Sequence, residues 1–186
     1  MSGRTTGAAL LALALAVVVA GPARAADEGL ALRLRAERLA ADDRCEEALP
    51  ILARARSLSP DDARAALLEG QCRTRLGRYA EAAQSLEAAV QLDPALDEAW
   101  LQLAIARYHA RDLAGARTAL DEAERRMPER AEVSFYRGVL LLEEAQSEPA
   151  ATKLERAATL DSRVDPLASF YAGRAWESTG ENERAR

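Results

Sequence analysis

The chain has 186 residues, a mass of 20.1 kDa and a formal net charge of −5, with 25 Lys and Arg against 30 Asp and Glu. An acidic chain without a block of basic residues is unsuited to binding a phosphate backbone, so we expect no nucleic-acid partner. One His and two Cys disfavour a metal cage or a His-based catalytic site. The apolar fraction is 49% and the aromatic fraction only 4%, and small, Ala-rich side chains favour closely packed helices over strands. The composition favours an all-helical binding protein with no cofactor or metal, and argues against an enzyme.

The first 25 residues have the organisation of a secretory signal peptide. Arg4 supplies a positive charge, an apolar run follows over residues 8–20, and Gly21-Pro22 ends it. Ala23-Arg24-Ala25 is a small-x-small motif, which predicts cleavage between Ala25 and Ala26. The run is shorter than the roughly 18–20 residues that a spanning helix needs, although an uncleaved anchor is the alternative. With no Cys near the cleavage point, we expect a periplasmic or secreted protein that is not a lipoprotein and has no membrane span in its mature chain.

The rest of the chain repeats with a constant period of about 34 residues, and periods of this length indicate stacked structural repeats. The recurring columns are Ala48, Ala82, Ala116 and Ala150; Leu52, Leu86, Leu120 and Leu154; Ala55, Ala89, Ala123 and Ala157; Pro60, Pro94 and Pro128; and the small residues Ala36, Gly70, Ala104 and Gly138. Three prolines in register, out of seven in the chain, are hard to obtain by accident.

Each period predicts two helices and a turn. Ala and Leu at offsets of four and three lie on one face of the second helix, and the proline that follows cannot continue the helix. The predicted units are 29–62, 63–96, 97–130 and 131–164, with a partial unit at 166–186. Short breaks are expected between the paired helices, the fourth of them running from Ala145 to Pro149. In the partial unit one extra residue shifts the phase, which puts Gly173 in the small column.

These residues resemble the tetratricopeptide repeat family. The unit from Asp97 to Arg130 carries the residues that the family pattern expects: Trp100, Leu103, Ala104, Ala116, Leu120, Ala123 and Pro128. The resemblance implies an all-α fold, a right-handed α-α superhelix of about four helix-turn-helix repeats plus a partial fifth. The chain departs from the pattern in its first helices, where Arg35, Glu69 and Arg137 replace a family leucine.

The same resemblance implies that the first helices line a concave groove in which a partner peptide lies. Carried over position by position, the groove residues are Arg64, Leu67, Gln71, Leu101, Ile105, Tyr108, Phe135, Val139, Leu142, Phe170 and Arg174. The middle of this set is apolar and arginines flank it, which suits a hydrophobic helix or extended segment that carries carboxylates. The alternatives are that a further C-terminal helix covers these residues, or that a tightly wound superhelix buries them.

The two cysteines and the single histidine are the remaining residues with distinctive chemistry. Cys45 begins one predicted second helix and Cys72 lies late in the next first helix, so stacking can make them neighbours. They form either a disulfide, which an oxidising compartment would favour, or two separate core fillers. His109 lies at a helix end without a second His or a thiolate pair, which indicates a solvated or capping side chain.

The sequence therefore predicts a non-catalytic protein–protein interaction scaffold in the cell envelope, which binds a peptide or helix of a partner protein in its groove. The alternative is the N-terminal docking arm of a larger envelope protein, with a catalytic, outer-membrane export or peptidoglycan-binding domain beyond Arg186. The sequence favours neither a particular partner nor a particular oligomeric state.

Overall fold

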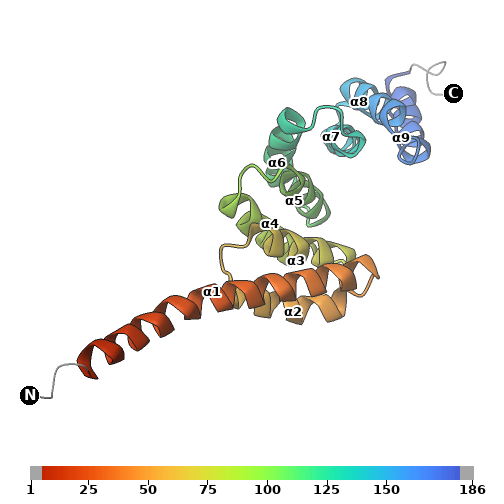
Figure 1. The fold of residues 1–186 in the computed structure, drawn as a ribbon. Helices are drawn as coiled ribbons and strands as arrows, with labels where there is room; N and C mark the ends of the chain where they lie inside the picture. Colours follow the sequence, from red (N-terminus) through yellow and green to blue (C-terminus); the bar gives the residue numbers. More distant parts are fainter. Residues whose placement is uncertain (1–5, 181–186) are drawn as a thin grey trace, which may run out of the picture.

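The computed structural model describes residues 6–180, with side chains described from residue 24 onward. In this part of the chain the regular structure is entirely α-helical, as predicted. The helices are α1 (Thr6–Ala41), α2 (Cys45–Leu58), α3 (Ala63–Arg75), α4 (Tyr79–Leu92), α5 (Asp97–His109), α6 (Leu113–Arg126), α7 (Ala131–Glu143), α8 (Ser147–Leu160) and α9 (Asp165–Thr179) (Figure 1).

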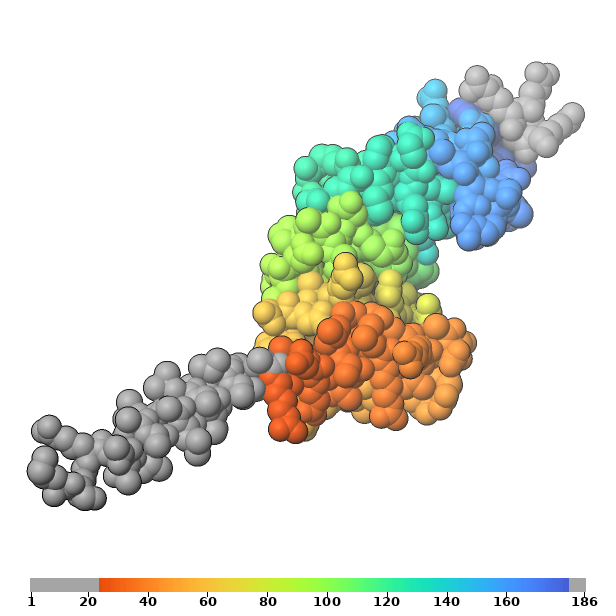
Figure 2. All heavy atoms as spheres, viewed as in Figure 1, coloured from red at the N-terminus to blue at the C-terminus, as the bar shows by residue number. Residues whose placement is uncertain are grey.

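The helices form a stack of hairpins in which α1 pairs with α2, α3 with α4, α5 with α6, and α7 with α8. Figure 2 shows the hairpins following one another in chain order along an elongated body. Successive first helices (α1, α3, α5, α7 and α9) contact one another, whereas successive second helices within the described residues do not. Because the first helices are closer together, they line the inner side of the curved stack. The predicted superhelical repeat architecture is confirmed.

The second helices supply the core through the columns that the sequence predicted. The Ala, Leu and Ala of each unit, such as Ala82, Leu86 and Ala89 of α4, are 0–1% exposed in all four second helices. Full burial of a leucine contributes about 1.5–3 kcal/mol, and alanines on either side allow the partner helix to approach closely. The apolar contacts continue from one hairpin to the next, so no hairpin forms a core alone.

The small column lies where the two helices of a hairpin meet. A Cβ on Gly138 would lie 2.5 Å from Leu154 Cγ and 3.1 Å from the carbonyl oxygen of Ala150, so only glycine fits at this approach. In α9 the buried small residue is Ala172, at 4% exposure, while Gly173 is only partly buried. The expected phase shift to Gly173 is therefore wrong for this column, which keeps the same step as in the preceding units.

The hairpin turns recur with the same period as the helices. Asp43, Gly77, Arg111 and Ala145 all have φ between 59° and 72°, and the amide of the residue after each donates to the carbonyl oxygen five positions earlier. Each first helix therefore ends in one residue with the left-handed (αL) backbone conformation. That conformation costs a non-glycine residue about 1–2 kcal/mol. The fourth break is shorter than expected, because α8 begins at Ser147 and takes Pro149 into its first turn, where proline is tolerated.

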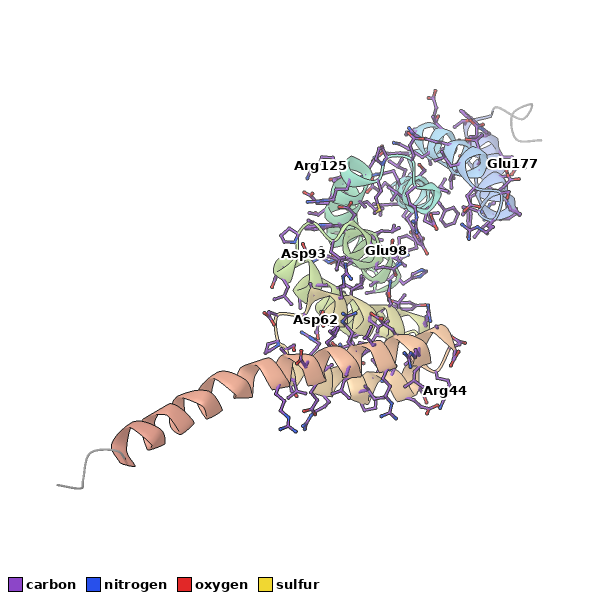
Figure 3. The ribbon with its side chains drawn as sticks, in the orientation of Figure 1. Arg44, Asp62, Asp93, Glu98, Arg125 and Glu177 are labelled. Carbon is purple, nitrogen blue, oxygen red and sulfur yellow. The ribbon has the colours of Figure 1, made fainter. Side chains whose placement is uncertain are left out.

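An aspartate joins the first hairpin to the start of α3. Asp62, labelled in Figure 3, accepts a hydrogen bond from the amide of Ala65 in the first turn of α3, at 3.0 Å. It accepts another from Arg33 on α1, whose Nε lies 2.8 Å from Asp62 Oδ2. The carboxylate therefore caps α3 and fixes its N-terminus against α1.

The glutamate that replaces a family leucine in the second unit is held by two ion pairs. Glu69 is 5% exposed, accepts a hydrogen bond from Arg56 on α2, and forms an ion pair with Arg73 one turn further along α3, where Arg73 Nη2 lies 2.8 Å from Glu69 Oε1. The pair with Arg56 crosses from the first hairpin to the second. A buried carboxylate needs such partners, because an unpaired charge is costly to remove from water.

In the fourth unit an arginine, Arg137, replaces the same leucine, and its ion pairs have the reverse order of charge. Arg137 Nε lies 3.2 Å from Glu124 Oε2 on α6, and a second ion pair joins Arg137 to Asp121. Two repeat steps along the chain, Glu124 takes the position of Arg56 and Arg137 takes that of Glu69. The same position between hairpins therefore holds an Arg–Glu pair at one junction and a Glu–Arg pair at another. Arg35, the third replacement, is exposed.

The predicted cleavage point between Ala25 and Ala26 lies within α1, which is continuous from Thr6 to Ala41 and extends past the end of α2 in Figure 1. Residues 1–5 of the predicted leader lie outside the described part. Glu28 of α1 contacts Arg54 of α2, and Gly29 lies against Ser59, the residue after α2; cleavage after Ala25 would leave both contacts in place. Where side chains are described, no helix combines the length and apolarity needed to cross a bilayer.

Candidate partner-binding groove

All four tyrosines of the chain, both phenylalanines and the single histidine belong to one network of ring contacts. The network runs from α4 to α9 and consists of Tyr79, Tyr108, His109, Phe135, Tyr136, Phe170 and Tyr171. Tyr79 stacks on His109 with ring centroids 4.8 Å apart, and the other contacts are edge-on, at 5.3–6.2 Å. Edge-on and offset pairs are the favourable arrangements for aromatic rings.

Two adjoining pockets open beside these rings, across the first helices α5, α7 and α9. The first, of about 530 Å³, is lined by Tyr108, Val139, Leu142, Glu143, Ala145, Ser147, Tyr171, Arg174 and Ser178. The second, of about 370 Å³, is lined by Tyr108, His109, Arg111, Phe135, Tyr136, Val139, Leu167 and Tyr171. Because Tyr108, Val139 and Tyr171 line both pockets, we treat them as one concave surface and call it the aromatic groove.

An ion pair joins two of the helix ends that border the aromatic groove. Arg111, just after α5, lies with Nη1 2.9 Å from Glu143 Oε1 and Nη2 3.2 Å from Glu143 Oε2. The hydrogen bond from Arg111 holds the pKa of Glu143 below its ordinary value. Burial raises the pKa of Tyr108 and lowers that of His109, so both rings favour their neutral forms here.

Arg174 contributes a charge that the described part of the protein does not neutralise. It is exposed on α9 and lines the larger pocket, and among the described residues it has no acidic partner within ion-pair distance. The other arginine of the groove, Arg111, is already paired with Glu143. The groove therefore combines neutral aromatic and aliphatic walls with the guanidinium group of Arg174.

The structure brings some of the predicted groove residues together and separates others. Those that line the two pockets are Tyr108, Phe135, Val139, Leu142 and Arg174. Phe170, 58% exposed, contacts Tyr171 at the edge of the groove. Arg64, Leu67 and Gln71 belong to α3 and do not line either pocket.

Leu101 and Ile105, expected in the groove, line neither of its pockets. Leu101 is 1% exposed and packs with Ala123 and Val133, so it has no surface to offer a ligand. Ile105 is partly buried against the same cluster and lines neither pocket. The apolar strip expected to begin at Leu101 begins instead at Tyr108, because the middle of α5 is enclosed by its neighbours α4, α6 and α7.

Tyr171 and Leu167 are groove residues that the family positions did not indicate. The helix α9 packs on α8 through Ala172 and Trp176, and Leu167 and Tyr171 line the groove. A repeated tripeptide in the sequence indicates Tyr171. The tripeptide Ser-Phe-Tyr occurs at 134–136 and again at 169–171, so each of the predicted groove residues Phe135 and Phe170 is followed directly by a tyrosine.

Stacked antiparallel hairpins with a constant step along the chain define an α-solenoid of helical repeats. Two models of the tetratricopeptide repeat match the sequence, over residues 33–97 and 73–134. The chain belongs to the tetratricopeptide repeat family. None of the curated proteins compared with the sequence matches it.

Solved structures of similar fold cover most of the chain. The solved chain of MamA from Desulfovibrio magneticus RS-1, which runs from residue 41 to the end, superposes with a TM-score of 0.77 and 18% identity, covering 86% of this chain and 89% of the MamA chain. TTC0263, a TPR protein from Thermus thermophilus, gives 0.65 and 21%, covering 84% and 86%. YrrB, described as a TPR protein with an unusual peptide-binding site, gives 0.69 and 21%, covering 81% and 77%. At these identities the similarity establishes the shared fold.

Proposed function

We propose that the protein is a non-catalytic interaction scaffold that binds a segment of a partner protein in the aromatic groove. The observation that carries this proposal is the gathering of aromatic rings in an aromatic-poor chain: three of the four Tyr, one of the two Phe and the only His line the groove, and Tyr79 and Phe170 contact these rings from its edges. Aromatic side chains are enriched where proteins bind one another, because they bury a large area and lose little conformational entropy. The peptide-binding site described for YrrB, a protein of the same fold, supports the same class of function.

The composition of the groove defines the kind of segment that would fit. Tyr108, Val139 and Leu142 offer an apolar wall, and the two pockets together have room for several side chains of a bound segment. The guanidinium of Arg174 favours a carboxylate at one end of the bound segment, since charge-assisted hydrogen bonds of this type are strong. The expected ligand is therefore an apolar or aromatic stretch next to an acidic residue.

Our proposal assigns this scaffold to a site outside the cytoplasm, in the periplasm or secreted. Support comes from the predicted leader, with Arg4, the apolar run at 8–20 and the Ala23-Arg24-Ala25 motif. The second candidate is that these repeats are the docking arm of a larger envelope protein. The exposed Leu167 and Phe170 on α9, at 52% and 58%, favour it, since another helix could cover them.

Crosslinking in the native envelope, followed by identification of the partner, tests the proposal. The purified partner is then titrated against wild-type protein and against Tyr108→Glu, Phe135→Glu and Arg174→Glu. Leu92→Glu is the matched control, because Leu92 is a 41% exposed leucine at the end of α4 that lines neither pocket.

We expect each groove variant to weaken binding at least about tenfold, as is typical of buried interface anchors, while the circular dichroism of the helices is retained. The control should bind like the wild type. Wild-type affinity in all three groove variants would contradict the proposal, and so would an equal loss in Leu92→Glu.

A further inference from the structure

The two cysteines of the chain lie side by side in the core of the first two hairpins. Cys45 is the first residue of α2 and Cys72 lies in the last turns of α3, and their Sγ atoms are 2.7 Å apart. Cys45 is 2% exposed and Cys72 0%, and both pack in the cluster that includes Ala48, Leu52 and Ala65. This cluster joins the first hairpin to the second and is separate from the aromatic groove.

We propose that Cys45 and Cys72 form a structural disulfide that joins the first repeat to the second. The pairing requires no rearrangement of helices, because the two sulfur atoms are already in contact across the α2–α3 junction. In the reaction the two thiols lose two protons and two electrons to an oxidised small-molecule or protein disulfide. That oxidant is reduced to two thiols as the Cys45–Cys72 bond forms.

Burial determines when this bond can form. Burial raises the pKa of the Cys72 thiol to about 12, and only the thiolate attacks a disulfide. With both sulfur atoms enclosed, an external oxidant cannot reach them once α2 is docked on α3. The bond therefore forms while the hairpins are still assembling, and after assembly the same enclosure protects it from reductants.

The bond would strengthen a part of the stack with a structural weakness. The first hairpin is stabilised on one side only, because no repeat precedes it in the described part of the chain, and Leu30 and Leu34 of α1 are 45% and 44% exposed. A covalent link between residues 27 positions apart removes conformational freedom from the unfolded chain. For a closed loop of this length the unfolding equilibrium constant should fall several-hundred-fold, equivalent to a rise in Tm of about 10 °C.

The test uses the full chain refolded from denaturant in a mixture of reduced and oxidised glutathione, which makes it independent of the compartment assigned above. Cys45→Ala, Cys72→Ala and the double variant are refolded in parallel. Intact mass is measured without reductant, free thiols are alkylated in denaturant, and thermal unfolding is followed before and after reduction in denaturant and refolding as the dithiol.

We expect the wild-type chain to be lighter than the dithiol form by the mass of two hydrogen atoms, with neither cysteine alkylated. Its Tm should fall by about 10 °C on reduction, while the Tm of the double variant should not respond. Reductant added without denaturant should leave the bond intact. Two alkylated cysteines in the refolded wild type would overturn the proposal, and so would a wild-type Tm that is unchanged by reduction.

Discussion

Reversing the charge of Glu69 is a sharp test of how the hairpins are joined. Glu69→Arg would replace a 5% exposed carboxylate that contacts Arg56 and Arg73 with a third guanidinium group. Breaking a buried ion pair costs about 3–5 kcal/mol, because a charge is left without its partner. The two arginines are 29% and 24% exposed and can partly turn to water, so we expect a loss of about 3 kcal/mol.

The swapped variant Arg56→Glu/Glu69→Arg makes the test specific. It recreates at the first junction the charge order that Glu124 and Arg137 have at the third. We expect it to recover more than half of the loss. Recovery should be incomplete, because Arg73 would then lie one helical turn from a like charge.

Urea unfolding followed by circular dichroism measures these differences, with the midpoint and slope both reported because repeat arrays can unfold in parts. Glu81→Arg is the matched control, since Glu81 also lies near Arg73, at 3.7 Å, but is 57% exposed. It should cost no more than about 1 kcal/mol. A loss below about 1 kcal/mol for Glu69→Arg, or a swap no more stable than the single variant, would refute the reasoning.

Three further changes have defined outcomes. Gly138→Ala places a Cβ 2.5 Å from Leu154 Cγ and should destabilise the protein by about 1–3 kcal/mol in urea unfolding; a neutral effect would mean that the α7–α8 contact yields. Ala145→Gly, at φ 59°, should raise Tm by about 2–4 °C in a thermal scan, and a lower Tm would contradict the strain assigned to that turn. Because burial lowers the pKa of His109, the unfolded chain takes up the proton first as pH falls below about 6.5, so stability should decline there; His109→Phe should lack this decline in urea titrations at about pH 7.5 and 5.5, and an identical decline would exclude His109 as its source.

The sequence was sufficient to predict the second helices and the helix order, and insufficient for the details of the first helices. Ala82, Leu86 and Ala89 face the core because their spacing and size leave them one possible face. The accommodation of Glu69 could not be predicted in the same way, because its partner Arg56 lies on the preceding hairpin and the pairing appears only when the hairpins are stacked.

The positions carried over from the family predicted part of the groove. Tyr108 and Val139 line its pockets as expected, whereas Leu101 does not, because Ala123 of α6 and Val133 of α7 enclose it, and this packing exists only in the assembled stack. The orientation of α9 follows from its packing on α8 through Ala172 and Trp176, which a repeat pattern taken from inner units does not contain.

The inverted ion pairs make the order of the repeats part of the fold's chemistry. Deleting residues 63–130 would remove two whole units and preserve the helical periodicity, yet it would bring Arg56 against Arg137, two cations at a junction built for opposite charges. Deleting 63–96 alone would instead place Arg56 opposite Leu103, an apolar partner. Gene rearrangements that shorten or shuffle this array are therefore constrained by charge as well as by length.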